Sequence, residues 1–213
     1  PVERNQEFQE RDTKGNKVFF VDFPMVQAEI MLLSKGTEGF SLKEYIQSEF
    51  YNTYFGFGLS SIVFQEIRES RALAYSAYAY NGNPNEPDKA HYLTAYVGTQ
   101  ADKMPAAIEG MKEIIQDIPL VEEQVETARQ SIMKKIETDR ITDADIYWTY
   151  RKNEKLGYPR DLRKDSYQFI QTATLEDLKK FHSNKIKGRK FDMLVMADKD
   201  EIDMEYLESQ GEV

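Results

Sequence analysis

The stretch FQEIRESRALAYSAYAY, from Phe64 to Tyr80, changes from a helical to an extended pattern halfway along. Its charged first half carries an apolar stripe at helical spacing, and a serine just before it can cap the helix. Its second half, from Leu73, alternates small and aromatic residues with the period of two that is typical of a strand. Arg68, at the edge of the stripe, and Tyr75, at the start of the strand, are therefore predicted to come from different elements.

The neighbouring sequence extends this strand into a sheet. Tyr92 to Gln100 also alternates, and the loop NGNPNEPDKA that joins it to the first strand is rich in the turn formers Asn, Gly and Pro. The two stretches predict an antiparallel hairpin with a long loop. Upstream, a strand from about Lys17, a break at Pro24 and a second strand through residues 26–32 precede a helix that begins after Ser41.

Helical patterns dominate after the hairpin. Apolar residues recur at intervals of three and four from Asp102 to Ile118 and again from about Val121 to Ile136, which predicts two amphipathic helices. Further along the chain the pattern predicts three shorter helices and a last strand, at residues 143–156, 161–172 and 175–182 and at FDMLVMA from Phe191.

The order of these elements lacks the regular alternation of a doubly wound sheet. It predicts an α+β fold, in which helices pack against a largely antiparallel sheet. No Pro/Ser-rich linker or low-complexity tract divides the chain. Residues 1–16 are predicted to be a polar lead-in or linker, and residues 17–213 are predicted to be one domain.

Composition excludes several classes of function. With 213 residues, 40% of them hydrophobic, the chain can bury a sizeable core. A net charge of −9 and a pI near 4.9 argue against a nucleic-acid partner. No apolar run approaches the roughly 18 residues of a membrane span, and the start of the chain is too polar for a signal peptide, so any targeting segment would precede it.

The residues available for metal binding and nucleophilic catalysis are few. The chain has no cysteine, which leaves its redox compartment undecided, and its only histidines are His91 and His182. It contains no H-x-x-E-H or H-E-x-x-H motif, so no zincin-type metal site is predicted within it. Both histidines are predicted to be ordinary surface residues, and neither lies in a recognisable nucleophile context. The acidic run after Ala197 is predicted to be a solvated end rather than a metal site.

The segment GFGLSS, residues 56–61, is similar to a truncated G-x-G-x-x-G loop. Ser61 replaces the third glycine, and a helix end precedes the segment where a dinucleotide fold requires a strand. We expect these glycines to let a turn pass close to neighbouring backbone instead. Taken alone, Arg68 is expected to be a helix-flank arginine paired with Glu, and Tyr75 to be a core tyrosine.

The longer stretch GFGLSSIVFQEIRESRALAYSAYAY closely resembles the signature of the C-terminal, non-catalytic domain of insulinase/pitrilysin-type zinc metallopeptidases, the inverzincins. In that family a glycine-containing turn, a helix ending in R-E and an L-[GA]-Y strand start occur together. HYLTAYVGTQADKMPAAIEGMKEII is similar to the strand and helix that follow, and VEEQVETARQSIMKKIETD to the family's long amphipathic helix. The resemblance spans roughly residues 18–211 and implies an α+β domain of the kind shared with mitochondrial processing peptidase.

The resemblance also implies roles for two residues. In active members one domain carries H-x-x-E-H and a downstream glutamate on zinc, and a related second domain closes over the substrate. An arginine and a tyrosine seven positions apart in that second domain reach the scissile peptide, and the matching positions here are Arg68 and Tyr75. Arg68 is expected to hold substrate backbone, and Tyr75 to donate a hydrogen bond to the tetrahedral oxygen.

The missing H-x-x-E-H limits this chain. Any catalytic zinc, its ligands and the general base are expected to come from another domain or subunit, so the chain alone is expected to be inactive and to hold no cofactor. The leading hypothesis is the substrate-binding, non-catalytic half of a zinc-dependent metalloendopeptidase, whose partners are a zinc-bearing catalytic domain or subunit and a peptide or unfolded polypeptide.

Two alternatives stay open. In the first, the same fold serves assembly without catalysis, as in the core subunits of respiratory complexes. In the second, which ranks well behind, the chain binds a nucleotide. The residues assign no compartment, although an extracytoplasmic location is compatible with a bacterial member of the family.

Overall fold

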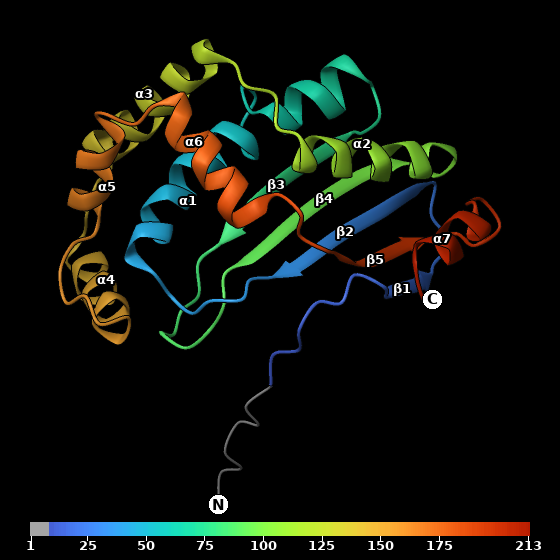
Figure 1. Cartoon of the computed structure of the whole chain (residues 1–213), viewed down its shortest axis with the longest axis horizontal. Coiled ribbons are helices and arrows are strands. Elements are labelled where there is room, and N and C mark those ends of the chain that lie inside the picture. The colour runs from blue at the N-terminus through green and yellow to red at the C-terminus, as the bar shows by residue number, and fades with distance from the viewer. Residues whose placement is uncertain (1–8) are drawn as a thin grey trace, which may run out of the picture.

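One mixed sheet organises the part of the chain that the computed structural model describes, residues 9–213. Its strand order is β1–β5–β2–β4–β3 (Figure 1). Neighbouring strands are antiparallel except for β1 and β5, which run parallel. The predicted largely antiparallel sheet is therefore confirmed. The strand bounds are β1 Val18–Asp22, β2 Gln27–Lys35, β3 Ser76–Gly82, β4 Tyr92–Gln100 and β5 Asp192–Ala197.

Helices cover one face of this sheet (Figure 1). The five helices predicted between the hairpin and the last strand are confirmed as α2 to α6. Among residues 9–213, no helix is both long enough and apolar enough to cross a membrane. The helix bounds are α1 Leu42–Phe55, the π-helix η1 Phe64–Ser70, the 3-10 turn η2 Ala101–Lys103, α2 Met104–Gln116, α3 Glu122–Thr138, α4 Asp143–Lys155, α5 Arg163–Ile170, α6 Leu175–Phe181, the π-helix η3 His182–Ile186 and α7 Met204–Gln210.

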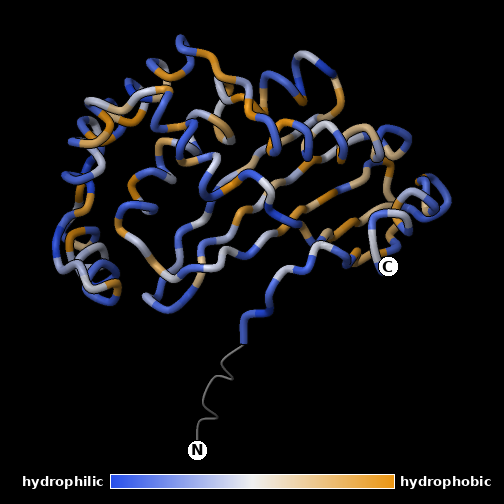
Figure 2. Tube along the Cα trace, in the orientation of Figure 1, coloured by the Kyte–Doolittle hydropathy of each residue, from blue (hydrophilic) through white to orange (hydrophobic). Residues whose placement is uncertain are grey.

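The core lies between the sheet and these helices. Alternate residues of β2 are buried on the helix side, and the residues between them face the other way, as the period of a strand requires. Figure 2 shows hydrophobic residues along the strands of the sheet. The buried β2 residues belong to one hydrophobic core with the apolar stripes of α1, α2 and α3, which include Phe50, Tyr54, Ala107, Met111, Val125, Ala128 and Ile132.

The other face of the sheet is partly exposed and carries stacked aromatic rings. Tyr78 of β3 stacks on Tyr96 of β4 with ring centroids 4.9 Å apart. Phe57, from the turn after α1, stacks on Tyr78 and Tyr80 at 5.8 and 5.5 Å. Offset stacking of this kind stabilises neighbouring strands beyond the area it buries. The three tyrosines are half-buried packing residues.

The edge strand β3 is attached to the end of α1. A Cβ on Gly56 would lie 1.5 Å from the carbonyl oxygen of Ala79, so only glycine allows this approach of the two backbones. The expected close backbone contact at the GFGLSS turn is thus confirmed. Beside it, the Asn52 amide donates to the Asn81 carbonyl at 3.1 Å and accepts from the Asn81 N–H at 2.7 Å, which satisfies backbone groups at the edge.

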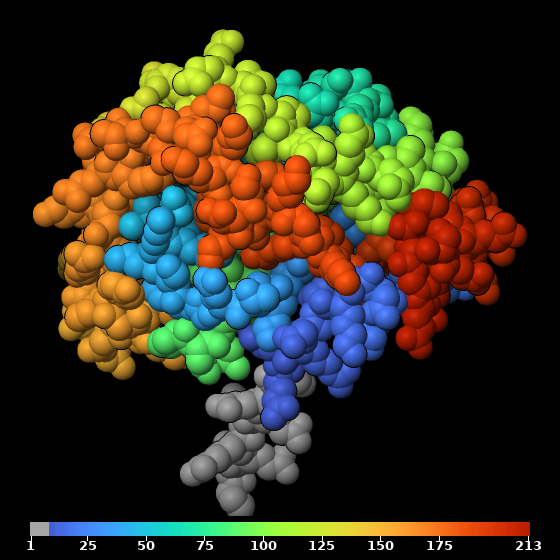
Figure 3. Space-filling model, in the orientation of Figure 1, coloured from blue at the N-terminus to red at the C-terminus, as the bar shows by residue number. Residues whose placement is uncertain are grey.

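Two predictions concern the first and last segments of the chain. The predicted lead-in, residues 1–16, is described only from residue 9. There, Thr13 accepts a hydrogen bond from the Lys35 backbone, and the Gly15 N–H donates to Asp192. The acidic side chains after Ala197 are exposed or half-buried, as the prediction of a solvated run requires, but the segment also forms α7, which buries Leu207. Figure 3 shows α7 in red against the rest of the domain.

Candidate functional site

The candidate site begins at the C-terminal end of η1, where the chain leaves the helix through a turn with an unusual backbone conformation. Ser61 caps the beginning of η1 by accepting a hydrogen bond from the Phe64 N–H at 3.3 Å. Ile67 anchors the helix in the core. At the other end Ala72 has a φ of +48°, a left-handed conformation that costs a non-glycine residue about 1 kcal/mol or more. The Leu73 N–H then bonds back to the Ile67 carbonyl at 2.9 Å, as at many helix ends.

Hydrogen bonds to β4 hold the next residues in place. The Thr99 hydroxyl donates to the Leu73 carbonyl at 2.5 Å, and the Tyr75 N–H donates to the Gly98 carbonyl at 2.9 Å. Regular strand structure begins only at Ser76, so the predicted strand start at Leu73 is three residues early. Tyr75 is therefore fixed through its backbone, while its side chain is 57% exposed.

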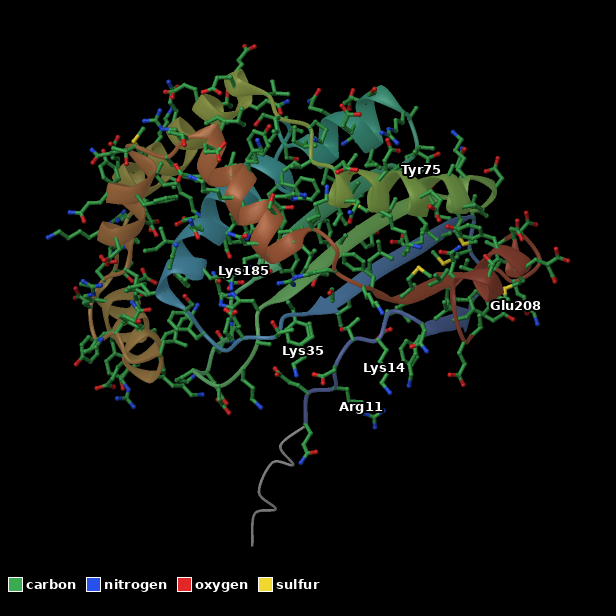
Figure 4. All side chains as sticks on the ribbon, in the orientation of Figure 1. Arg11, Lys14, Lys35, Tyr75, Lys185 and Glu208 are labelled. Atoms are coloured by element: carbon green, nitrogen blue, oxygen red, sulfur yellow. The ribbon has the colours of Figure 1, made fainter. Side chains whose placement is uncertain are left out.

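Arg68 and Tyr75 line the same pocket, which has a volume of about 260 Å³. The two residues come from η1 and from the segment before β3, as the switch in the sequence predicts. Tyr75 is labelled in Figure 4, near the end of the sheet where α2 begins. The remaining lining residues are Glu69, Ala72, Leu73, Ala74, Gln100 and Lys103.

The guanidinium of Arg68 is held by two neighbouring side chains but keeps hydrogen-bond donors that they do not use. It lies over the Phe64 ring, 4.8 Å from the centroid, which is a cation–π contact. Its Nε lies 3.7 Å from a carboxylate oxygen of Glu69, and the Arg68 side chain is 47% exposed. The contacts support the stem of the side chain. The guanidinium retains N–H donors suited to a carbonyl or carboxylate group.

The phenol of Tyr75 keeps its donor available. Its oxygen accepts a long hydrogen bond, 3.4 Å, from the Gln100 side-chain amide. A phenol can accept from one group and donate to another at the same time. The pocket thus presents a cationic fork and a neutral O–H donor, a pair that can bind a peptide backbone and a developing oxyanion.

Two residues of this pocket were not predicted from the sequence. Gln100 contacts the Tyr75 hydroxyl, and Lys103 lies 3.4 Å from the Ala72 carbonyl, to which it donates. Gln100 is the last residue of β4, and Lys103 ends the 3-10 turn η2 that follows it. Only the register of β3 against β4, in which Ser76 lies opposite Gly98, would have placed these two residues beside Tyr75.

A neighbouring arginine has a structural role instead. Arg71 makes two hydrogen bonds with Glu113 of α2, at 2.7 and 3.2 Å, and lies 3.8 Å from Glu66. The hydrogen bonds to Glu113 raise the pKa of Arg71, and those from Arg71 lower the pKa of Glu113. The arrangement ties the end of η1 to α2.

The prediction that both histidines are surface residues is wrong. His91 is 1% exposed and His182 is 4% exposed. Burial lowers the pKa of each, although Glu44 works in the opposite direction at His91, as does a contact with the Gln116 carbonyl at His182. His91 immediately precedes β4, and His182 is the first residue of η3. Within residues 9–213, no group of three or more His, Asp or Glu side chains is arranged to hold a metal ion.

Comparison with known proteins identifies the family. A family profile described as the peptidase M16 inactive domain matches residues 1–147. An uncharacterized zinc protease of Rickettsia bellii is 28% identical over 120 residues, which cover 55% of this chain and 28% of that protein. One from Rickettsia felis is 29% identical over 93 residues, or 44% of this chain and 22% of that protein.

Solved structures share the fold. A peptidase M16 inactive domain from Pseudomonas fluorescens matches with a TM-score of 0.72 and 16% identity, over 90% of this chain and 45% of that one. A protease from Helicobacter pylori matches with a TM-score of 0.70 and 13% identity, over 92% and 47%.

The fold and the sequence together define a metallopeptidase-type α+β domain. The chain belongs to the family of peptidase M16 inactive domains. It spans about a quarter of the length of the curated relatives and about half the length of the solved chains.

Proposed function

We propose that this chain is the substrate-binding, non-catalytic half of a zinc-dependent metalloendopeptidase. The observation that carries the proposal is the shared pocket of Arg68 and Tyr75, in a chain that belongs to the M16 inactive-domain family. The names of its relatives as zinc proteases support the same class of activity.

The proposal assigns the metal to a partner. A domain or subunit with H-x-x-E-H would supply zinc, which polarises the scissile carbonyl and activates water, together with a glutamate as base. This chain closes on that partner with the Arg68–Tyr75 pocket facing the substrate. The roughly twofold greater length of the solved relatives is in keeping with a second domain of similar size.

The two side chains have separate roles in the proposal. Arg68 donates to a backbone carbonyl of the bound peptide and so fixes its position. Tyr75 donates to the oxygen that becomes negatively charged as water attacks. A donor that meets this oxygen only in the transition state raises the rate without tightening ground-state binding.

The substrate is proposed to be a peptide or an unfolded polypeptide. The partly exposed sheet face at β3 supports this, because the exposed Phe57 ring, stacked on the half-buried Tyr78 and Tyr80, offers apolar surface to an extended chain.

The substitution Tyr75→Phe tests the proposal in the assembled enzyme. It removes one oxyanion donor and should lower kcat/KM by about 10²-fold or more, with KM changed little. The matched control is Tyr147→Phe on α4, because the Tyr147 side chain is 56% exposed, almost the same as that of Tyr75. The control should keep full activity. Unchanged turnover in Tyr75→Phe would assign Tyr75 to packing and refute its proposed role.

One similar solved structure favours a second candidate function. A chain of Complex III₂ from Candida albicans matches with a TM-score of 0.62 and 14% identity, over 91% of this chain and 48% of that one. The alternative proposal is that this chain is a structural or assembly protein without a catalytic partner. The discriminating observation is an H-x-x-E-H motif with a downstream glutamate, upstream of Pro1 in the parent gene or in a separately encoded partner. Its absence from both would favour assembly.

A further inference from the structure

A second cavity, of about 400 Å³, lies at the other end of the sheet. It is bounded by the end of β2, the loop after it, the start of β4 and the segment before β5. In the register of the sheet, Lys35 lies opposite Tyr92, whereas Tyr75 bonds to Gly98. Six strand residues separate those two places, or about 20 Å. The cavity is therefore separate from the Arg68–Tyr75 pocket.

Basic side chains gather around this cavity in an otherwise acidic protein. The lining includes Lys35, Lys185, Lys187, Arg189 and Lys190, against Glu38 and Glu44. Figure 4 shows Lys35 and Lys185 near one another at this end of the sheet. Their side chains are only 16% and 27% exposed, which is low for lysine.

Arg189 is held in the wall of the cavity by backbone groups. Its Nε donates to the Lys185 carbonyl at 2.5 Å, and its Nη1 donates to the Ser34 carbonyl at 3.3 Å. No carboxylate of residues 9–213 lies within ion-pair distance of its guanidinium. A Cβ on Gly36 would lie 3.4 Å from Nη2, so the glycine leaves that side of the guanidinium less covered than any other residue would.

A buried histidine also lines the cavity without a hydrogen-bond partner. Both ring nitrogens of His91 lack one among the described residues, although the side chain is 99% buried. The nearest carboxylate oxygen, from Glu44, is 3.7 Å from Nδ1. A neutral imidazole has one donor and one acceptor to satisfy, and leaving them unpaired inside a protein costs free energy. The His91 ring therefore has hydrogen-bonding capacity that the described residues do not use.

The two acidic residues of the cavity are already engaged. Lys185 lies 2.6 Å from Glu38 and 2.9 Å from Glu44. The Glu44 carboxylate is buried and also accepts from Asn81 at 3.2 Å, so it stays in place. The Glu38 side chain is 67% exposed and can turn into solvent, which would leave Lys185 paired with Glu44 and with an N–H group available to a ligand.

From these contacts we infer that the cavity binds a small multivalent oxyanion, of the phosphate-chain or tricarboxylate class. Arg189, Lys185 and Lys190 supply the positive charge, and His91 supplies a neutral N–H donor. The volume equals that of roughly a dozen water molecules, which leaves room for an anion with several charged groups. The inference does not depend on the proposed peptidase function.

Calorimetric titration of the full chain tests this site. Tripolyphosphate and citrate are added separately in about 50 mM salt, with sodium chloride at matched ionic strength as the control. We expect saturable binding of at least one of the two anions, and the comparison shows which class the cavity prefers. Absence of binding by both would overturn the inference.

Two variants with opposite expected effects locate the binding. Lys190→Gln removes an exposed positive charge and should weaken binding about threefold or more, whereas Glu38→Gln removes a negative charge beside Lys185 and should tighten it by a similar factor. Lys135→Gln on α3 changes the net charge equally outside the cavity and should leave the affinity unchanged. Equal effects of Lys190→Gln and Lys135→Gln would reduce the binding to general charge attraction and refute the site.

The two histidines provide a local readout. In imidazole ¹⁵N spectra the ring signals of His91 should shift on adding the anion that binds. Those of His182, which lies against the Gln116 carbonyl at 3.3 Å, should not. Binding that leaves the His91 signals unmoved would contradict the inference.

Discussion

Arg68 and Arg71 lie three positions apart around the end of η1, and their surroundings separate a binding role from a structural one. Arg71 is 30% exposed and forms a bidentate pair with Glu113. Arg68 is more exposed and has only the long contact with Glu69 besides the Phe64 ring. Bidentate pairs are the geometry in which a surface ion pair contributes measurably to stability.

A pair of substitutions tests this separation. Arg71→Ala should lower the free energy of unfolding by about 1 kcal/mol, because it breaks the link between η1 and α2. Arg68→Ala should change it by less than about 0.5 kcal/mol. Urea denaturation of both variants provides the measurement. A larger loss in Arg68→Ala would mean that Arg68 is a structural residue.

At the scale of elements, the attachment of β3 to α1 holds the end of the edge strand that lies away from Tyr75. Asn52 pairs with both backbone groups of Asn81 in place of a further strand. Asn81 in turn donates to Glu44 and Ser48 of α1 and is fully buried. Such buried polar networks are costly to break, since each lost partner leaves an unsatisfied group.

Asn52→Ala should therefore destabilise the domain by about 2 kcal/mol, because it leaves the backbone N–H and carbonyl of Asn81 without their partners. The neighbouring substitution Thr53→Ala is the control. The Thr53 hydroxyl only bonds back to the Glu49 carbonyl within α1, so its loss should cost less than about 0.5 kcal/mol. Similar urea midpoints for the two variants would show that β3 does not depend on this pairing.

The elements with a regular hydrophobic period could be predicted from the sequence, and those without one could not. β2, α2 and α3 each bury one face, and the spacing of their apolar residues shows it. α7, with the sequence MEYLESQ, buries only Leu207 and so has no stripe to detect. The burial of His91 depends on the Phe40 ring and on Glu44 of α1, which are distant in sequence.

The candidate site, too, could be predicted from the sequence only in part. The helix-to-strand switch predicted that Arg68 and Tyr75 come from different elements. Their roles rest on the resemblance to a family rather than on local pattern. Gln100 and Lys103 required the register of the hairpin, which is fixed by tertiary packing.

At the scale of the whole molecule, the buried histidines predict how stability depends on pH. Burial lowers the pKa of His91 and of His182, although Glu44 and Glu38 oppose this at His91 while Lys185 and Arg189 reinforce it. The folded state therefore binds a proton on each ring less readily than the unfolded chain does. Below about pH 6.5 the unfolded chain binds protons that the folded chain does not.

The free energy of unfolding should consequently fall as the pH drops from about 7.5 to 5.5, above the range in which carboxylates titrate. Urea denaturation across this interval measures the slope. His182→Gln should make the slope shallower, because one of the two responsible groups is gone. Stability that stays constant or rises over the interval would contradict the account of the buried histidines.

The proposed role of Tyr75 is to recognise the tetrahedral stage of peptide hydrolysis on a partner's zinc. A phosphinic peptide mimics that stage, so its Kd for the assembled enzyme is the most direct measurement. In Tyr75→Phe the Kd should rise by about the factor by which kcat/KM falls, on the order of 10²-fold, while substrate KM changes little. An unchanged Kd for the phosphinic peptide in Tyr75→Phe would contradict the claim.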